Sequence, residues 1–214
     1  MKDYDREEKL KDKKDKAVQG ILAGAREVFA EAGFAGARVD EIARRAGVNK
    51  AMIYYRIGDK ATLYAEVLHQ VFFGVYERLV QNLDQERSPE GKLRAYIHTF
   101  SRTFEEHPHL APIMMRELAS GGKDLPDVVL VDLGRILGTL MGIIEEGTQL
   151  GLFARANPTI VHLMIIAPMF MRKRMNEIVS RRKQHSGILR HLDKGEPLDI
   201  AAEVERLMLK ALRR

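Results

Sequence analysis

Apolar residues recur three and four positions apart along almost the whole chain, and this periodicity constrains the fold more than any other feature. Ile21, Leu22, Ala25, Val28 and Phe29 are one clear example. Residues spaced in this way share one face of a helix with 3.6 residues per turn. No long stretch alternates apolar and polar residues with the period of two that half-buried strands show. The sequence therefore predicts an all-α fold.

Capping residues, glycines and prolines divide the chain into helices. Asn49, Asp59, Ser88 and Asp199 stand where helix N-caps are expected. The helices predicted from these signals span about residues 16–32, 39–46, 50–55, 60–83, 88–106, 114–118, 127–148, 158–174 and 199–212. Residues 1–15 carry dense mixed charge and are predicted to form a solvated, frayed tail; an arm that touches a nucleic-acid backbone is the alternative. Residues 184–197 are the expected mobile loop.

Two short predicted helices are joined by a tight turn near residue 47. Gly47 supplies the positive φ that such a turn needs, and Asn49 is a natural cap for the second helix. Ala43 and Ala46 are small, so the helices on either side of the turn can approach closely, while Ile53 fills the core. This pattern predicts a helix-turn-helix unit.

The outward face of the second short helix is cationic and rich in hydrogen-bonding groups. Lys50, Tyr54 and Tyr55 are predicted to project from it, with Arg56 and Lys60 just beyond. Side chains of these types contact phosphates and base edges. The alternative is that the two tyrosines pack between neighbouring helices and that the basic residues are ordinary surface charge. The spacing of the whole set favours DNA binding.

The stretch from Gly33-Phe34 through Val39-Asp40-Glu41-Ile42-Ala43 and Ala46-Gly47-Val48 to Ile53-Tyr54-Tyr55, with Lys60 and Leu63 beyond, resembles the DNA-binding domain of TetR-family transcriptional regulators. The resemblance covers about residues 16–68. It implies a helix-turn-helix domain at 16–60 and a helical regulatory and dimerisation domain at 61–214. It also implies a homodimer that binds a pseudo-palindromic double-stranded operator, usually as a repressor, and is released by a small molecule.

Carried over position by position, the resemblance assigns base and phosphate contacts to the recognition helix and a phosphate contact to Lys60. Asn49 stands where Ser is usual, and Ala51-Met52 replaces Gly followed by a hydroxyl residue. Ala37-Arg38 replaces two hydroxyl residues, so Arg38 is expected to meet a phosphate by charge. Arg56-Ile57 replaces His or Tyr followed by Phe. The residues expected to bind DNA are Arg38, Asn49, Lys50, Ala51, Tyr54, Tyr55, Arg56 and Lys60.

The last two predicted helices carry the expected dimer interface. The helix from about residue 158 is apolar on more than one face, and the final helix has an apolar stripe. The resemblance assigns both to a four-helix bundle shared by two subunits; closure of the chain's own core is the alternative. The expected interface residues are Ile160, Met164, Ile200, Val204, Leu207, Met208 and Ala211.

A ligand pocket is expected between the helix at 60–83 and the helices within 88–148. Aromatic and methionine side chains at helical spacing more often belong to the hydrophobic core than to a pocket. The prediction of a pocket therefore rests on the residues as a group and not on any one of them. Such a set would take a largely apolar effector. The candidate lining residues are Phe72, Tyr76, Tyr96, Phe100, Phe104, Met114, Met115, Ile136 and Leu140, with Phe73, Met141, His98, Arg116, Glu117 and Arg135 as further possibilities.

Other functional classes find little support. The chain has no Cys, and His107 and His109 flank a proline without a third spaced ligand, so neither a metal nor another cofactor is expected. The sequence shows no convergent nucleophile or acid–base set, so an enzyme is not expected. The apolar run 159–171 is too short to span a membrane, and a cytoplasmic location is expected. The net charge is +5, which is compatible with DNA binding, and the basic clusters at 172–174 and 181–183 are read as solvated helix ends. An activator, or a regulator triggered by a protein, remains the alternative function, and a helical enzyme that uses a cavity of the C-terminal domain is the remote alternative.

Overall fold

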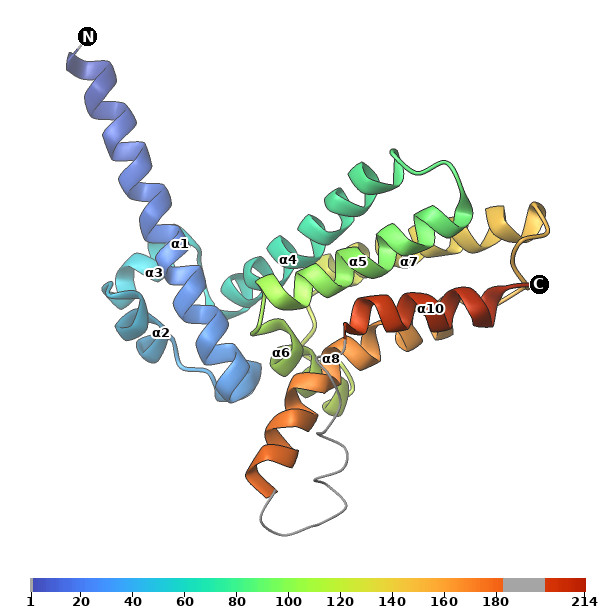
Figure 1. Ribbon diagram of the computed structural model, residues 1–214. Helices are drawn as coiled ribbons and strands as arrows, with labels where there is room; N and C mark the ends of the chain where they lie inside the picture. The colour runs from blue at the N-terminus through green and yellow to red at the C-terminus, as the bar shows by residue number, and fades with distance from the viewer. Residues whose placement is uncertain (1, 183–198) are drawn as a thin grey trace. The chain divides into compact units, whose positions relative to one another are not determined.

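The computed structural model describes the backbone of residues 2–182 and 199–214, and the side chains of residues 16–171 and 199–214. Over these residues the chain is all-α (Figure 1). The helices are α1 (Lys2–Gly36), α2 (Val39–Ala46), α3 (Lys50–Arg56), α4 (Lys60–Leu83), α5 (Pro89–Glu106), α6 (Leu110–Ala119), α7 (Asp127–Gln149), α8 (Pro158–Arg182) and α10 (Ile200–Leu212). Within the described ranges, the β-type pairing is one isolated antiparallel bridge between Phe153 and Arg213.

The chain divides into two compact units. The first unit comprises Met1–Phe72 and Pro108–Asp132, and the second comprises Phe73–His107 and Leu133–Arg214. The first unit therefore holds α6 in addition to the three N-terminal helices. This division by packing differs from the predicted division by function at residues 60 and 61, which it does not test.

The predicted helix starts are confirmed by their caps. The Asn49 side chain accepts a hydrogen bond from the Ala51 N–H at 2.8 Å, and Asp59 accepts one from the Thr62 N–H at 2.8 Å. Ser88 and Asp199 accept equivalent bonds at 3.1 Å from Gly91 and Ala202. Each of these bonds satisfies an N–H that the helix itself leaves unpaired.

Several predicted helix limits are wrong. Helix α1 begins at Lys2 rather than near Lys16, and it continues to Gly36 across a kink at Gly33. Helix α6 begins at Leu110 rather than near residue 114, and α8 continues to Arg182 rather than ending at Arg174. Residues 2–16 contain neither Pro nor Gly, and the sequence places Asp5, Glu7 and Asp12 four positions before a lysine, a spacing that supports helices. The loop predicted at 184–197, and the side chains of the two basic clusters, lie outside the described residues.

Helices α1 and α2 pack together in the core of the first unit, with a close contact at Gly24. Ile21, Leu22, Phe29 and Ile42 are fully buried in this core. A Cβ atom at Gly24 would lie 3.2 Å from the Ala46 N atom and 3.3 Å from the Ile42 O atom. Since backbone atoms cannot move away as a side chain can, α2 packs directly on the bare Cα of α1.

Gly24→Val is therefore expected to lower the free energy of unfolding by about 2 kcal/mol, because it overpacks a contact made by backbone atoms. Gly20→Ala, one turn earlier, is the matched control, since its Cβ would meet its nearest neighbour at 3.9 Å. That control is expected to stabilise the protein by about 0.5–1 kcal/mol through helix propensity. Urea unfolding of both variants measures the difference, and equal effects would exclude a close α1–α2 contact.

The second unit contains α5, the greater part of α7, α8 and α10. In Figure 1, α10 lies alongside α5, and the end of α10 meets the loop that follows α7. Leu93, Tyr96, Ile136, Leu140 and Ile165 are fully buried in this unit. Among the described residues, no helix has the length and apolarity that crossing a membrane requires.

Candidate nucleic-acid interface

The turn between α2 and α3 has the geometry that the sequence predicts. Gly47 ends α2 with φ 65° and ψ 29°, in the left-handed region that favours glycine. The Val48 N–H then donates to the Ala43 O atom at 3.0 Å, and α3 begins at Lys50 behind the Asn49 cap. Two short helices joined by a three-residue turn are a helix-turn-helix.

Helix α3 buries one residue, leaves Arg56 partly buried and exposes the others. Ile53 is fully buried, whereas Tyr55 is 79% exposed, Tyr54 49% and Met52 37%. The Arg56 guanidinium lies over the Tyr55 ring, 5.1 Å from its centroid. The tyrosines therefore do not pack between helices, and the outward face predicted for this helix is open to solvent.

Lys50, the first residue of α3, forms an ion pair with Asp40 of α2. The Lys50 Nζ atom lies 3.0 Å from Asp40 Oδ1 and 3.1 Å from Oδ2, and both side chains are largely exposed. The hydrogen bond from Lys50 holds the pKa of the Asp40 carboxyl below its usual range, and Asp40 raises the pKa of Lys50 in turn. The helix-turn-helix therefore presents an acid of α2 and a base of α3 side by side.

Lys60, for which the sequence predicts a phosphate contact, is bonded within its own unit. Its Nζ atom donates to the Phe34 O atom at 3.0 Å and to the Ala37 O atom at 3.3 Å, and it lies 4.6 Å from the centroid of the Phe34 ring. These contacts fasten the start of α4 to the segment that links α1 to α2. Its contact with phosphate stays a prediction.

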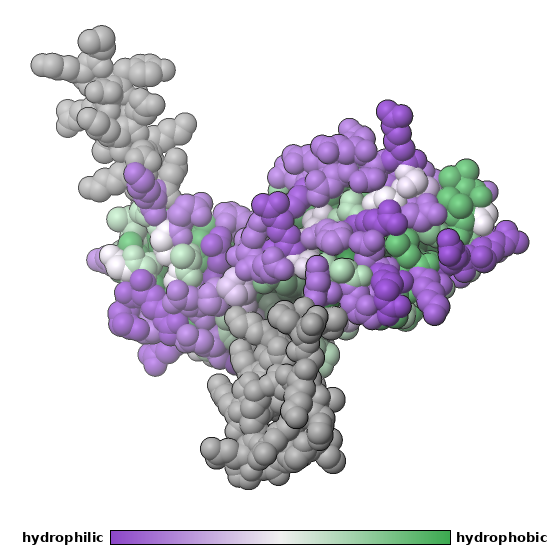
Figure 2. Space-filling model, in the orientation of Figure 1, coloured by the Kyte–Doolittle hydropathy of each residue, from purple (hydrophilic) through white to green (hydrophobic). Residues whose placement is uncertain are grey.

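The remaining charge of α2 is divided between an internal network and an exposed arginine. Arg45 binds Glu31 at 2.6 Å and Glu41 at 2.8 Å, and hydrogen bonds from Arg44 and Arg45 lower the pKa of Glu41 to about 2. Arg38 precedes α2 and is exposed, and its side chain makes no capping bond. Figure 2 shows that the surface formed by α2 is hydrophilic.

Helix α6 supplies two first-unit contacts that sequence analysis missed. Arg116 donates to the Ala30 O atom at 3.3 Å and to the Glu31 O atom at 2.5 Å, near the end of α1. The next residue, the buried Glu117, accepts a bond from the Tyr64 hydroxyl at 2.6 Å. Each contact joins residues more than fifty positions apart, and local sequence patterns do not predict such pairs.

The predicted ligand-lining residues divide between the two units. Phe72, Met114 and Met115 belong to the first unit and the other six to the second, so a common cavity is not tested. Within the second unit the Tyr96 and Phe100 ring centroids are 5.1 Å apart. The Tyr96 hydroxyl lies 2.8 Å from Nδ1 of His162, a buried polar partner that sequence analysis missed.

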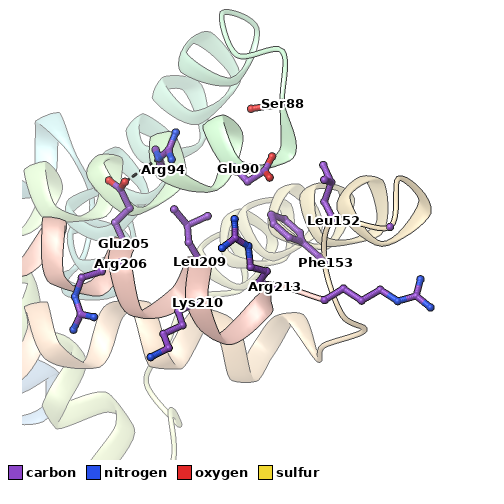
Figure 3. Close-up of a pocket in the computed structure, with 12 residues that line it drawn as sticks. Ser88, Glu90, Arg94, Leu152, Phe153, Glu205, Arg206, Leu209, Lys210 and Arg213 are labelled. Carbon is purple, nitrogen blue, oxygen red and sulfur yellow. Dashed lines mark hydrogen bonds and ion pairs between the residues drawn. The ribbon is translucent and has the colours of Figure 1, made fainter.

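A groove of about 880 Å³ lies within the second unit, away from the predicted lining residues (Figure 3). Phe153, Leu152 and Leu209 contribute its apolar wall. The ion pair between Arg94 of α5 and Glu205 of α10 is 2.8 Å long, and Figure 3 shows it at one end of the group of lining residues. The other charged residues of the lining are Glu90, Arg206, Lys210, Arg213 and Arg214.

Helix α8 exposes a stripe of large apolar side chains. Ile160 is 55% exposed, and Leu163, Met164 and Met171 are each almost half exposed, at positions that share one helix face. On α10, Leu207 is 45% exposed, whereas Val204 and Met208 are buried within the chain's own fold. The residues predicted for a dimer interface therefore divide into an exposed set and a set that closes the chain's own core.

Comparison with known proteins gives a consistent result. Residues 21–67 match the family described as "Bacterial regulatory proteins, tetR family". The chain is 26% identical over 149 residues, 70% of each chain, to the HTH-type transcriptional regulator RutR of Escherichia coli. It is 31% identical over 141 residues, 65% of this chain and 66% of the other, to the HTH-type transcriptional repressor NicS of Pseudomonas putida. The Bacillus subtilis regulator FadR, solved in complex with stearoyl-CoA, has a TM-score of 0.68 and 21% identity, over 91% of this chain and 99% of that one; this likeness is one of fold.

Proposed function

Because the chain belongs to the tetR family of bacterial regulatory proteins and is a transcriptional regulator, we propose that it is a homodimeric repressor released from its operator by a small molecule. The observation that carries the proposal is the solvent-exposed face of α3, held by a capped, glycine-containing turn. In the proposed division, residues 16–60 bind DNA and residues 61–214 dimerise and bind the effector. Such a protein acts in the cytoplasm, where the operator lies.

On this proposal the DNA contacts come from the exposed residues around α3 and from the partly buried Arg56. Lys50, Tyr54 and Tyr55 reach base edges from the recognition helix, while Arg38 and Arg56 bind phosphates by charge. The Ala51 N–H is already capped by Asn49, so these two residues set the position of the helix. Lys60 acts through its bonds to the Phe34 and Ala37 carbonyls, which hold α4 against the α1–α2 link.

The exposed apolar stripe of α8 supports the dimer. Ile160, Met164 and Leu207 are large, exposed apolar side chains, and a second subunit that covers them would remove them from water. A dimer also fits the DNA function, because two recognition helices reach successive major grooves about 34–36 Å apart. The buried Val204 and Met208 support the interface from beneath.

A largely apolar effector is supported by the aromatic and aliphatic residues buried in the helical domain. Since FadR of Bacillus subtilis was solved with stearoyl-CoA, a long-chain acyl thioester is the first compound to test. An effector that weakens DNA binding must bind more weakly to the DNA-bound protein by the same factor. Titration of the compound in the presence and absence of operator measures both effects.

Lys50→Ala is expected to weaken binding to the selected operator by about tenfold or more, because it removes a contact to a base edge. Tyr54→Phe tests the hydroxyl alone and is expected to weaken binding by a smaller factor. Lys210→Ala, on the exposed surface of α10, removes the same charge from the second unit and is the control. Fluorescence anisotropy with a labelled operator measures all three. Wild-type affinity in both α3 variants would exclude this face as the reading surface.

A further inference from the structure

The Asp40–Lys50 pair places an exposed carboxylate beside the first residue of the proposed DNA-reading helix. DNA phosphates repel a carboxylate, and an exposed ion pair contributes little to stability. Asp40 is 60% exposed, and both of its oxygens lie within 3.1 Å of the Lys50 ammonium. An acid in the first turn of α2 stabilises the start of that helix, but beside DNA phosphates it lowers affinity for DNA in general. Discrimination between sequences is a benefit that offsets this loss of affinity.

Building on the proposed function, we propose that Asp40 and Lys50 act as one unit that reads a guanine–cytosine base pair in the major groove. Lys50 is the first residue of α3, and the N-terminal residues of a recognition helix are those that contact base edges. Its ammonium has three protons, so it can donate to a base while it stays bonded to Asp40. Beside this ammonium, the Asp40 carboxylate keeps free lone pairs that can accept a hydrogen bond from a base.

The chemistry of this pair matches one base pair better than the other. In the major groove, guanine presents the acceptors N7 and O6, and cytosine presents its N4 amino donor beside them. Lys50 donates to the guanine acceptors, and Asp40 accepts from the cytosine amino group. An adenine–thymine pair places the adenine amino donor between its two acceptors, so the same pair of side chains makes one contact fewer. Asp40 is therefore a specificity-determining residue.

Asp40→Ala tests this assignment. The wild-type protein is expected to lose about tenfold in affinity when the guanine–cytosine pair in each half-site is replaced by adenine–thymine. Asp40→Ala is expected to lose most of that discrimination and to bind a scrambled duplex more tightly than the wild type does. Lys50→Ala should lose the same discrimination, and the double variant should lose no more than either single variant, because the two residues act as one unit.

The controls separate reading from folding and from charge. Glu105→Ala removes one exposed carboxylate of the second unit and should leave discrimination unchanged. If Asp40 only supports the first turn of α2, Asp40→Ala lowers the melting temperature and keeps the wild-type discrimination, which would overturn the assignment. If the wild-type protein recovers no inverted repeat from random DNA, the proposed function itself fails. If it recovers one and Asp40→Ala reads it unchanged, only the role of Asp40 fails.

Discussion

Gly147→Ala is expected to lower the free energy of unfolding by about 3 kcal/mol, the cost of losing a buried aromatic side chain. The Phe153 ring lies directly on the Cα of Gly147 and is 2% exposed. A Cβ atom at position 147 would overlap this ring, with its Cγ atom only 2.6 Å away. The ring would have to leave its site, and the bridge between Phe153 and Arg213 would open with it.

Gly138→Ala and Gly142→Ala are the matched controls for this variant. Both glycines lie on α7, and a Cβ atom at either would meet no other atom within 4 Å. Each control is expected to stabilise the protein by about 1 kcal/mol, because alanine favours a helix more than glycine does. Chemical denaturation of the three variants gives the comparison. If Gly147→Ala is as stable as the controls, Phe153 does not occupy the place described here.

Acid is expected to destabilise the protein through His162, by about 3 kcal/mol between pH 6.5 and pH 4. Burial lowers the pKa of this imidazole from 6.5 to about 4 in the folded protein. The folded state therefore takes up the proton at lower pH than the unfolded state does. The contribution of the neutral His162 imidazole to the free energy of unfolding is complete above pH 6.5 and is lost progressively as the pH falls to about 4.

His162→Asn isolates this contribution from the titration of carboxylates elsewhere. Asparagine keeps a polar atom near the position of Nδ1, so it can still bond to the Tyr96 hydroxyl, and it does not titrate in this range. The difference in unfolding free energy between wild type and variant should shrink or reverse as the pH falls from 6.5 to about 4. A difference that stays constant with pH would show that His162 is not buried in its neutral form.

The helix-turn-helix can be predicted from the sequence alone because the residues that determine it are close together in the chain. Gly47, Asn49 and the small alanines all act within a few residues of one another, and the structure confirms the turn, the cap and the exposed face of α3. The predicted start of α1 is wrong because dense mixed charge is typical of a solvated tail, whereas the acids and bases of this segment have a spacing that supports a helix.

Other contacts around the candidate site could not be predicted in this way. They join residues that are far apart in the sequence, or they depend on how the side chains are oriented in the folded protein. Lys60 bonds to carbonyls more than twenty positions earlier, and Arg116 reaches the end of α1 from α6. The Asp40–Lys50 pair joins two helices that flank a turn, so its formation depends on how closely they approach. The close contact at Gly24 depends on the same packing.

The most direct test of the central claim is the selection of bound sequences from a randomised duplex pool at near-physiological salt. A homodimeric repressor with this recognition helix is expected to recover an inverted repeat with fixed half-site spacing. Binding through phosphate attraction alone recovers unpatterned DNA and weakens steeply as the salt concentration rises. That second result would contradict the assignment of α3 as a sequence-reading helix.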